Sequence, residues 1–392
     1  MPTLPAEMLA DALARLEAAD ARYVARYVAR YVAPGEPAAR QPVHTYYLPA
    51  QRFDRHTPAE LGAQARATLR QHAPDAEVFA DAIGLAPALA EGVYARVVAK
   101  LEREPIEDLR LDFEDGYGLR PDDEEDASAR AAATELAAMA PIPFSGLRLK
   151  TLGGATGARA LRTLDLFLAT LLDRAGRLPD GFAILLAKIT SLEHVRVAGD
   201  VLDALEPRLG LAAGALRLDV MVETTQCVLD ADGRSMLPAL LDAARGRLRA
   251  AHLGTYDFTG ACGIAAAHQG LRHPACDFAK HMMKMAYAET GVWLSDGSTH
   301  VLPVGDGDDL RAAWRLHADD VRHSLVGGYY QGWDLHPAQL PTRFGAVYGF
   351  YRAGLAALRR DIATDAGTAS AARGFIARGL GCGAFSPDEV GP

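Results

Sequence analysis

The chain has 392 residues, of which 49% are apolar and 23% are charged, and it carries a formal net charge of −9. The apolar share is enough for a large core, and the acidic balance argues against a general nucleic-acid surface, which needs concentrated Lys and Arg. Four scattered cysteines without a C-x-x-C pair, no visible signal peptide and no apolar run of membrane-spanning length favour a cytoplasmic protein.

The N-terminal region contains one unusual stretch, RYVARYVARYVA, at residues 22–33. Its four-residue period predicts an amphipathic helix that ends at Pro34 and Gly35. The stretch could offer a basic, aromatic surface to an anion or a partner, but a surface helix that arose by local duplication is the more common origin of such a pattern. We therefore expect residues 1–42 to form a helical extension.

Eight segments beyond residue 42 have the apolar pattern of strands, and stretches with helical periodicity separate most of them. They cover residues 43–50, 108–115, 145–150, 182–189, 216–224, 248–258, 292–296 and 329–337. From the second segment on, the strand ends recur about every 34 to 40 residues, which suits one strand, one helix and two loops. The longer first interval predicts extra helices between the first two strands.

This alternation predicts an α/β protein with a (β/α)8 TIM barrel over residues 43–341, preceded by the N-terminal helical extension and followed by a C-terminal helical segment over residues 342–392. An open, doubly wound sheet is the alternative. We prefer the barrel because there are eight units and no G-x-G-x-x-G follows the first strand. The C-terminal segment could cover the barrel mouth or pack against another subunit, and we expect a homo-oligomer.

Polar residues stand at or near the ends of most predicted strands. In a barrel the carboxyl ends of all strands point to one mouth, so side chains far apart in the sequence can meet there. The polar residues concerned are Glu114, Asp115, Arg148, Lys150, Lys188, Glu223, Asp257, Asp296 and His336.

This collection is rich in carboxylates and contains no Cys/His cluster, which favours a hard divalent cation over zinc. Glu223 and Asp257 occupy matching positions on neighbouring strands and suit a shared Mg²⁺, or Mn²⁺ in its place. Arg148 could hold a substrate carboxylate or carbonyl through its planar donors. A metal and a guanidinium beside one oxygen can stabilise an enolate, which arises when a carbon–carbon bond next to a carbonyl forms or breaks.

Six motifs, in order, resemble the strand-end motifs of the HpcH/HpaI aldolase and citrate lyase β-chain superfamily, which also includes malyl-CoA lyases and, more distantly, malate synthases. They are DFED (112–115), GLRLK (146–150), AKITSLEHV (187–195), MVET (221–224), LGTYD (253–257) and LHPAQL (335–340). The resemblance covers roughly residues 43–345. It implies a (β/α)8 barrel and Mg²⁺-dependent cleavage or formation of a carbon–carbon bond next to a carboxylate or thioester.

Carried over by position, the resemblance implies metal ligation by Glu223 and Asp257 and a substrate role for Arg148. It also implies that Glu114 and Asp115 lie under the metal site, where such acids hold metal-bound water or orient other groups. A nearby ion and an arginine would then explain why a strand tolerates acids at its end. We count Arg148, Glu114 and Asp115 as the catalytic candidates.

The chain departs from the superfamily's usual motifs at two places. Ala187 stands where a proline often precedes the lysine, and Lys150 stands where an asparagine is usual, so the substrate's head group stays open. Acyl-CoA lyases of the superfamily take a catalytic aspartate from a C-terminal segment, often of a neighbouring subunit. The candidates here are Asp361, Asp365 and Asp388, and no motif selects among them.

Three further residues are candidates for substrate binding besides Arg148. Lys188 could serve the site or a buried ion pair. His44, on the first strand, could bind substrate or satisfy a core hydrogen bond. His336 precedes a proline, which suggests a turn as much as a catalytic base.

The sequence therefore predicts a Mg²⁺-dependent carbon–carbon lyase, aldolase or condensing synthase that acts on a small oxo- or hydroxy-acid, or its CoA thioester, through a metal-stabilised enolate. One alternative is a phosphoenolpyruvate-type enzyme on a related barrel, although GDGDD at 305–309 is too acidic for its phosphate loop. The other alternative is a barrel without catalysis that serves as a partner module. We expect neither a nucleic-acid partner nor a membrane location.

Overall fold

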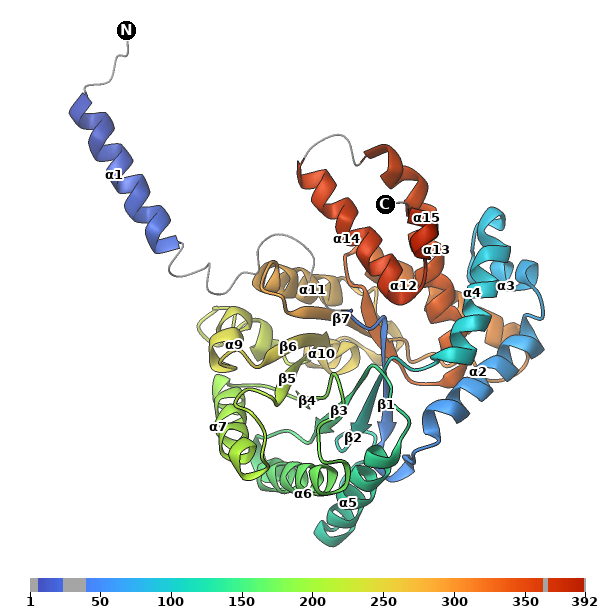
Figure 1. Ribbon diagram of the computed structural model, residues 1–392, viewed down its shortest axis with the longest axis horizontal. Coiled ribbons are helices and arrows are strands. Elements are labelled where there is room, and N and C mark those ends of the chain that lie inside the picture. The colour runs from blue at the N-terminus through green and yellow to red at the C-terminus, as the bar shows by residue number, and fades with distance from the viewer. Residues whose placement is uncertain (1–5, 24–39, 362–365, 391–392) are drawn as a thin grey trace.

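Eight parallel strands form a closed barrel in the part of the chain that the structure describes, and helices surround it (Figure 1). The computed structural model describes residues 6–23, 40–361 and 366–390. Each strand pairs with the next one, and β8 pairs with β1, which confirms the predicted fold class. The strands are β1 (His44–Pro49), β2 (Asp108–Asp112), β3 (Phe144–Leu149), β4 (Ala183–Leu186), β5 (Arg217–Val222), β6 (Leu248–Leu253), β7 (Trp293–Ser298) and β8 (Gln331–Asp334).

Helices cover the outside of the barrel and extend it at both ends of the chain (Figure 1). Between β1 and β2 lie α2 (Thr57–His72), α3 (Ala76–Ile83) and α4 (Ala90–Arg103). The later connections contain α5 (Asp122–Ala138), α6 (Gly157–Ala175), α7 (Leu192–Arg208), α8 (Thr225–Val228), α9 (Leu237–Ala243), α10 (Thr255–Ala261), α11 (Pro274–Tyr287) and α12 (Gly307–Val326). The terminal helices are α1 (Ala6–Tyr23), α13 (Leu340–Asp361), α14 (Ala366–Cys382) and α15 (Pro387–Val390). None of the described helices is long and apolar enough to span a membrane.

Local sequence accounts for where these helices begin and end and for the face that they bury. α3 starts after Asp75, whose side chain accepts a hydrogen bond from the backbone N–H of Val78, and it ends at Gly84, which has a left-handed φ of 68°. α6 packs against α5 and β3. Its buried apolar residues recur every three or four positions, and they are Ala160, Leu164, Phe167, Leu168 and Leu171.

The interior of the barrel contains buried ion pairs. Arg110 on β2 lies between two aspartates, with its Nε 2.8 Å from Asp108 Oδ1 and its Nη2 2.8 Å from Asp219 Oδ2. All three side chains are buried. Burial alone would raise the pKa of Asp219, but Arg249 and Arg110 outweigh it and hold the pKa well below its usual range. Paired charges therefore fill the barrel below its mouth.

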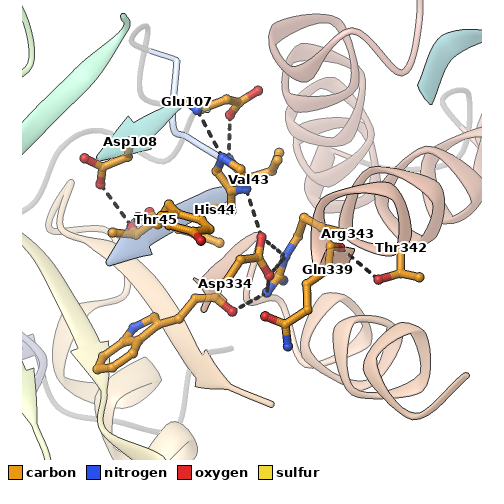
Figure 2. Close-up of polar contacts among 12 residues, drawn as sticks. Val43, His44, Thr45, Glu107, Asp108, Asp334, Gln339, Thr342 and Arg343 are labelled. Carbon is orange, nitrogen blue, oxygen red and sulfur yellow. Dashed lines mark hydrogen bonds and ion pairs between the residues drawn. The ribbon is translucent and has the colours of Figure 1, made fainter. Parts of the chain in front are cut away.

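A second buried network joins the barrel to the C-terminal helices, and Figure 2 shows most of it. Asp334, at the end of β8, lies 2.8 Å from His44 Nδ1, 3.1 Å from His317 Nε2 and 2.9 Å from Arg343 Nη2. The backbone N–H of Glu107 donates to His44 Nε2, so the ring proton of His44 is on Nδ1 and is donated to Asp334. The network therefore connects β1, β8, α12 and α13.

Glu107, just before β2, is another buried acid with cationic partners. Its carboxylate lies 2.5 Å from Lys100 Nζ and 2.7 Å from Arg40 Nη2, and it accepts the backbone N–H of Val43 at 2.8 Å. Burial would raise the pKa of Glu107, but Lys100, Arg40 and His44 outweigh it and lower the pKa to about 2. The segment that leads into β1 is thus attached to α4 through one carboxylate.

The sixth and eighth strands are shorter than the sequence pattern indicated, and this moves two predicted strand-end residues. α10 follows β6 almost at once, so Asp257 lies in the first turn of that helix. β8 ends at Asp334, and Pro337, which lacks a backbone N–H, lies in the short helix η6 (Pro337–Gln339). His336 is the N-cap of η6 rather than a strand end.

The second predicted strand also differs in extent. β2 ends at Asp112, so Glu114 and Asp115 lie in the loop that follows it. Of the RYVA repeat, residues 24–33 lie outside the described part of the chain, and the prediction of a helix there stays a prediction.

Replacing Asp334 by Asn should destabilise the fold strongly, because the buried Arg343 guanidinium would lose its counter-charge. We expect a loss of about 3–5 kcal/mol in the free energy of unfolding, measured by urea unfolding followed with circular dichroism. The matched control is Asp319→Asn on α12, whose partner Arg322 is partly exposed; it should cost less than about 1 kcal/mol. Equal losses in the two variants would contradict a special role for the network.

The free energy of unfolding should also fall in acid, because Glu107 becomes protonated there. Its pKa is about 2 in the folded chain against an ordinary value of 4.5. Its ionisation therefore stabilises the fold above about pH 4.5, and this contribution is lost as the pH falls through about 2. Thermal melting should show Glu107→Gln to be less stable than the wild type near neutral pH, with a difference that shrinks in acid. A difference that does not change with pH would rule this linkage out.

Candidate active site

A cavity of about 440 Å³ lies at the mouth of the barrel, where the carboxyl ends of the strands meet. Its wall comes from residues at the ends of several strands and from the first turn of α10. Four charged residues that the sequence singled out line it, namely Asp115, Arg148, Glu223 and Asp257, together with Asp112. The barrel thus brings together charged side chains that lie far apart in the sequence, from Asp112 at the end of β2 to Asp257 on α10.

Arg148 is held rigidly in the wall of this cavity by Asp112. Its Nε donates to Asp112 Oδ1 and its Nη2 donates to Asp112 Oδ2, each at 2.7 Å, which is a bidentate contact between buried groups. Its Nη1 is 3.4 Å from Asp115 and 3.6 Å from Glu114. Asp112 also accepts the backbone N–H groups of Glu114 and Gly116, each at 2.8 Å. Asp112 therefore orients both the arginine and the loop after β2.

Lys188 lies at the centre of the acids. Its Nζ is 2.8 Å from Glu114, 2.9 Å from Asp115 and 3.5 Å from Asp257. Its backbone N–H donates to Glu223 Oε1 at 2.5 Å. Its φ of 50° is in the left-handed region, which is unfavourable for a residue with a side chain. One residue thus contacts four carboxylates.

Burial separates the pKa values of these acids. Burial and the nearby charge of Asp257 raise the pKa of Glu223 to about 8, although Lys188 opposes the shift. Burial and the hydrogen bond with Asp115 raise the pKa of Glu114 to about 7. For Asp115 burial acts in the same upward direction, but the hydrogen bond with Glu114 and the neighbouring cations lower its pKa. Acids of different protonation behaviour therefore stand side by side, as in sites that move protons.

The donor set fits a hard divalent cation. Glu223 and Asp257 face the same cavity and influence each other electrostatically. Carboxylate oxygens are the ligands that Mg²⁺ and Mn²⁺ prefer, and Mg²⁺ often uses one or two of them, with water and substrate oxygens completing its shell. Among the described residues no three His, Cys, Asp or Glu side chains form a ready-made metal cluster. Glu223 and Asp257 could therefore hold the ion with help from substrate and water.

Three buried polar groups in the cavity wall have no hydrogen-bond partner among the residues that the structure describes: Tyr47 Oη, Thr255 Oγ1 and Trp333 Nε1. The three side chains are at least nine-tenths buried. The rings of Tyr47 and Trp333 pack with their centroids 4.4 Å apart, and the Arg148 guanidinium lies 5.4 Å from the Tyr47 ring centroid. Buried polar groups are normally satisfied, so polar atoms of a substrate or ordered water are the partners that these groups require. Sequence analysis missed all three.

Tyr256 and His300 form one edge of the cavity. Their rings are stacked, and the backbone N–H of His300 donates to Tyr256 Oη at 2.9 Å. Burial lowers the pKa of His300, which keeps its ring neutral near neutral pH. The exposed side chain of Arg52 lies in the same wall. This edge was also missed, because the strand-end pattern gave no signal for it.

The two histidines predicted to bind substrate do not line this cavity. His44 is fully buried in the network around Asp334 (Figure 2), where it satisfies core hydrogen bonds. His336 accepts the backbone N–H of Ala338 as an N-cap and borders a separate depression beside β1. Neither residue belongs to the site as we define it by the cavity.

Lys150 and the C-terminal aspartates also stay out of the cavity wall. Lys150 Nζ donates to the Phe113 carbonyl at 2.7 Å and to Glu125 at 2.8 Å, both buried, so Lys150 does not bring a cation into the cavity. Of Asp361, Asp365 and Asp388, only Asp388 has a described side chain, and it does not line the cavity.

The barrel is similar to solved structures of malate synthase from Haloferax volcanii. Its magnesium/glyoxylate complex gives a TM-score of 0.50 at 15% identity over 79% of this chain and 76% of that one. A native structure of the same enzyme at 3 mM glyoxylate gives a TM-score of 0.53 at 15% identity, over 80% of this chain and 76% of that one. The pyruvate/acetyl-CoA ternary complex of that enzyme gives a TM-score of 0.50 at 15% identity, over 79% of this chain and 71% of that one. At this identity the likeness shows the fold.

A sequence family matches almost the whole chain. The match covers residues 16–391, and the family is described as a domain of unknown function, DUF6986. No curated protein matches the sequence. Because the family match covers far more than half of the 392 residues, the chain belongs to the DUF6986 family.

Proposed function

We propose that the chain is a Mg²⁺-dependent enzyme that forms or breaks a carbon–carbon bond, as a lyase, aldolase or condensing synthase. Its substrate is a small oxo- or hydroxy-acid or the CoA thioester of one. The observation that carries this proposal is the gathering of Glu223, Asp257 and Arg148 in the wall of one cavity at the barrel mouth, with Lys188 in contact with the first two. Carboxylates that can hold an ion, next to a fixed guanidinium, suit the stabilisation of an enolate.

Glu223 and Asp257 are the residues that we assign to the ion, Mg²⁺ or Mn²⁺. Glu223 is 2% exposed, whereas the Asp257 side chain is 47% exposed, so one ligand would come from the cavity floor and the other from its rim. When bound, the ion would supply Lewis-acid stabilisation of the negative charge that develops on an enolate oxygen.

Arg148 is the group that we assign to the substrate's carboxylate or carbonyl oxygen. Asp112 occupies its Nε and Nη2, whereas Nη1 makes only longer contacts, 3.4 Å to Asp115 and 3.6 Å to Glu114, so we assign Nη1 to the ligand. Because Asp112 fixes the plane of the guanidinium, this donor does not have to reorganise during the reaction, and that favours charge stabilisation.

Glu114 and Asp115 are the residues that we assign to proton transfer. A group transfers protons most effectively when its pKa lies near the working pH, and burial raises the pKa of Glu114 to about 7. Lys188 bonds both carboxylates and would keep them oriented toward the cavity. Asp115, with its lowered pKa, would remain ionised beside it.

The size and lining of the cavity support a small polar substrate. About 440 Å³ is at the small end of ligand cavities, and the unpartnered Tyr47, Thr255 and Trp333 groups can hydrogen-bond oxygens of an acid. The malate synthase of Haloferax volcanii is solved with glyoxylate and with pyruvate and acetyl-CoA. This supports an oxo-acid, and a thioester as co-substrate, for the barrel described here.

Replacing Glu223 by Gln should remove Mg²⁺ binding while the shape of the side chain is kept. We expect the dissociation constant measured by isothermal calorimetry to rise by about a hundredfold or more, because a neutral amide is a poor ligand for a hard ion. Glu193→Gln, which changes an exposed acid on α7, should leave Mg²⁺ binding unchanged. Unaltered affinity in Glu223→Gln would remove the metal assignment.

Turnover can be sought by incubating the protein with Mg²⁺ and a panel of 2-oxo acids, 3-hydroxy acids and their CoA thioesters. We expect release of an aldehyde, glyoxylate or free CoA from at least one of them. Arg148→Lys should lower that turnover by about a hundredfold or more, because lysine cannot reproduce the planar fork of donors.

The matched control is Arg55→Lys, which alters a surface ion pair with Glu135 and should leave turnover unchanged. If the folded, Mg²⁺-loaded protein converts no member of the panel, the proposed substrate class is wrong. Turnover that survives in Arg148→Lys would instead remove only the role of the arginine.

A further inference from the structure

The ammonium of Lys188 occupies the point at which the acids of the cavity converge. It lies 2.8 Å from Glu114 Oε1, 2.9 Å from Asp115 Oδ1 and 3.5 Å from Asp257 Oδ2. The first two acids follow β2 and the third lies on α10, after β6. These strands stand on opposite sides of an eight-stranded barrel. One ammonium therefore joins carboxylates across the mouth.

The backbone of Lys188 is fixed as well as its side chain. Its φ of 50° is left-handed, and its N–H donates to Glu223 Oε1. Such a conformation persists in a residue with a side chain only where the surroundings impose it. The turn after β4 therefore directs both positive ends of this residue, the N–H and the ammonium, at the acids of the cavity.

Lys188 contacts both carboxylates that we assign to the ion, since its Nζ lies 3.5 Å from Asp257 Oδ2 and its backbone N–H donates to Glu223 Oε1. Two cations in contact with the same carboxylate repel each other strongly when they are only partly solvated. The Lys188 side chain is 30% exposed, and a lysine stem is flexible. The ammonium can therefore leave Asp257 without a change in the barrel.

We propose that Lys188 is a displaceable internal cation of the metal site. Without a divalent ion, its ammonium neutralises Glu114, Asp115 and Asp257 and keeps the cavity assembled. Nζ would leave Asp257 when Asp257 and Glu223 hold the ion. Displacement makes metal binding weaker than the carboxylates alone would give. This inference rests on the proposed metal site.

A permanent ion-pair role for Lys188 leads to the opposite expectation. If the ammonium only fixed Glu114 and Asp115 in place for the metal-loaded state, removing it would disorder the acids. Mg²⁺ would then bind less tightly to a variant without the lysine. The sign of the change in metal affinity therefore distinguishes the two roles.

The first test compares Mg²⁺ binding to the full chain and to Lys188→Met by isothermal calorimetry. We expect the variant to bind Mg²⁺ about tenfold more tightly or better, because no ammonium has to be displaced. The matched control is Lys280→Met, which also removes a lysine from two carboxylates, Asp277 and Asp296, away from the cavity. It should leave the affinity unchanged. Equal or weaker binding in Lys188→Met overturns the inference.

A second test uses the wild-type chain and does not depend on the folding of a variant. The lysines are acetylated with acetic anhydride, with and without saturating Mg²⁺. Mass spectrometry then measures the rate of acetylation at each lysine. Acetylation of Lys188 should become faster with Mg²⁺, because the displaced amine is freed from Asp257, while Lys280 should not respond. A rate at Lys188 that stays constant or falls overturns the inference.

The two proposals fail in different ways. If the wild-type chain binds no Mg²⁺ in the calorimeter, the metal-dependent function is wrong and the inference falls with it. If Mg²⁺ binds and depends on Glu223, but neither Lys188→Met nor the acetylation rate responds as expected, only the role of Lys188 is wrong.

Discussion

The mouth of the barrel depends on one electrostatic constraint, which is that five carboxylates lie close together in a partly buried space. In the described part of the chain, two cationic side chains contact them, and an uncompensated buried charge is expensive. The carboxylates are Asp112, Glu114, Asp115, Glu223 and Asp257, and the cations are Arg148 and Lys188. The excess of negative charge makes the site receptive to a further cation. Burial, together with a neighbouring carboxylate, raises the pKa of Glu114 and of Glu223.

The remainder of the barrel holds these groups in position. Arg110 links β2 to β5 through Asp219. The network around Asp334 joins β8 to β1 and to α13 (Figure 2). Since buried charges must keep their partners, these contacts fix the separation of the strands. The acids at the mouth are thus attached to a rigid ring, as a preorganised site requires.

The sequence predicted the closed barrel, and it predicted residues that the barrel brings to one mouth, because regular spacing and polar strand ends are local signals. It did not predict that Asp257 lies on a helix, since the apolar pattern continues past β6. His44 was misleading because an inward histidine has the same pattern whether it contacts substrate or Asp334. Tyr47 and Trp333 carried no signal, because their unpartnered groups depend on packing that only the folded chain defines. The sequence left Lys188 open between a site residue and an ion-pair partner, and only the folded chain shows which acids it contacts.

Departures from stable packing distinguish this cavity from the other buried polar clusters. Elsewhere a buried acid finds full compensation, as Glu206 does with Arg247 and two backbone N–H groups. Unpartnered polar atoms alone do not mark a site, since Tyr287 Oη is another. At the mouth, however, such atoms coincide with a left-handed lysine and with acids of raised pKa. Natural sequences keep such local conflicts mainly where function requires them, so their coincidence at the barrel mouth is the physical argument for our proposal that the chain is an enzyme.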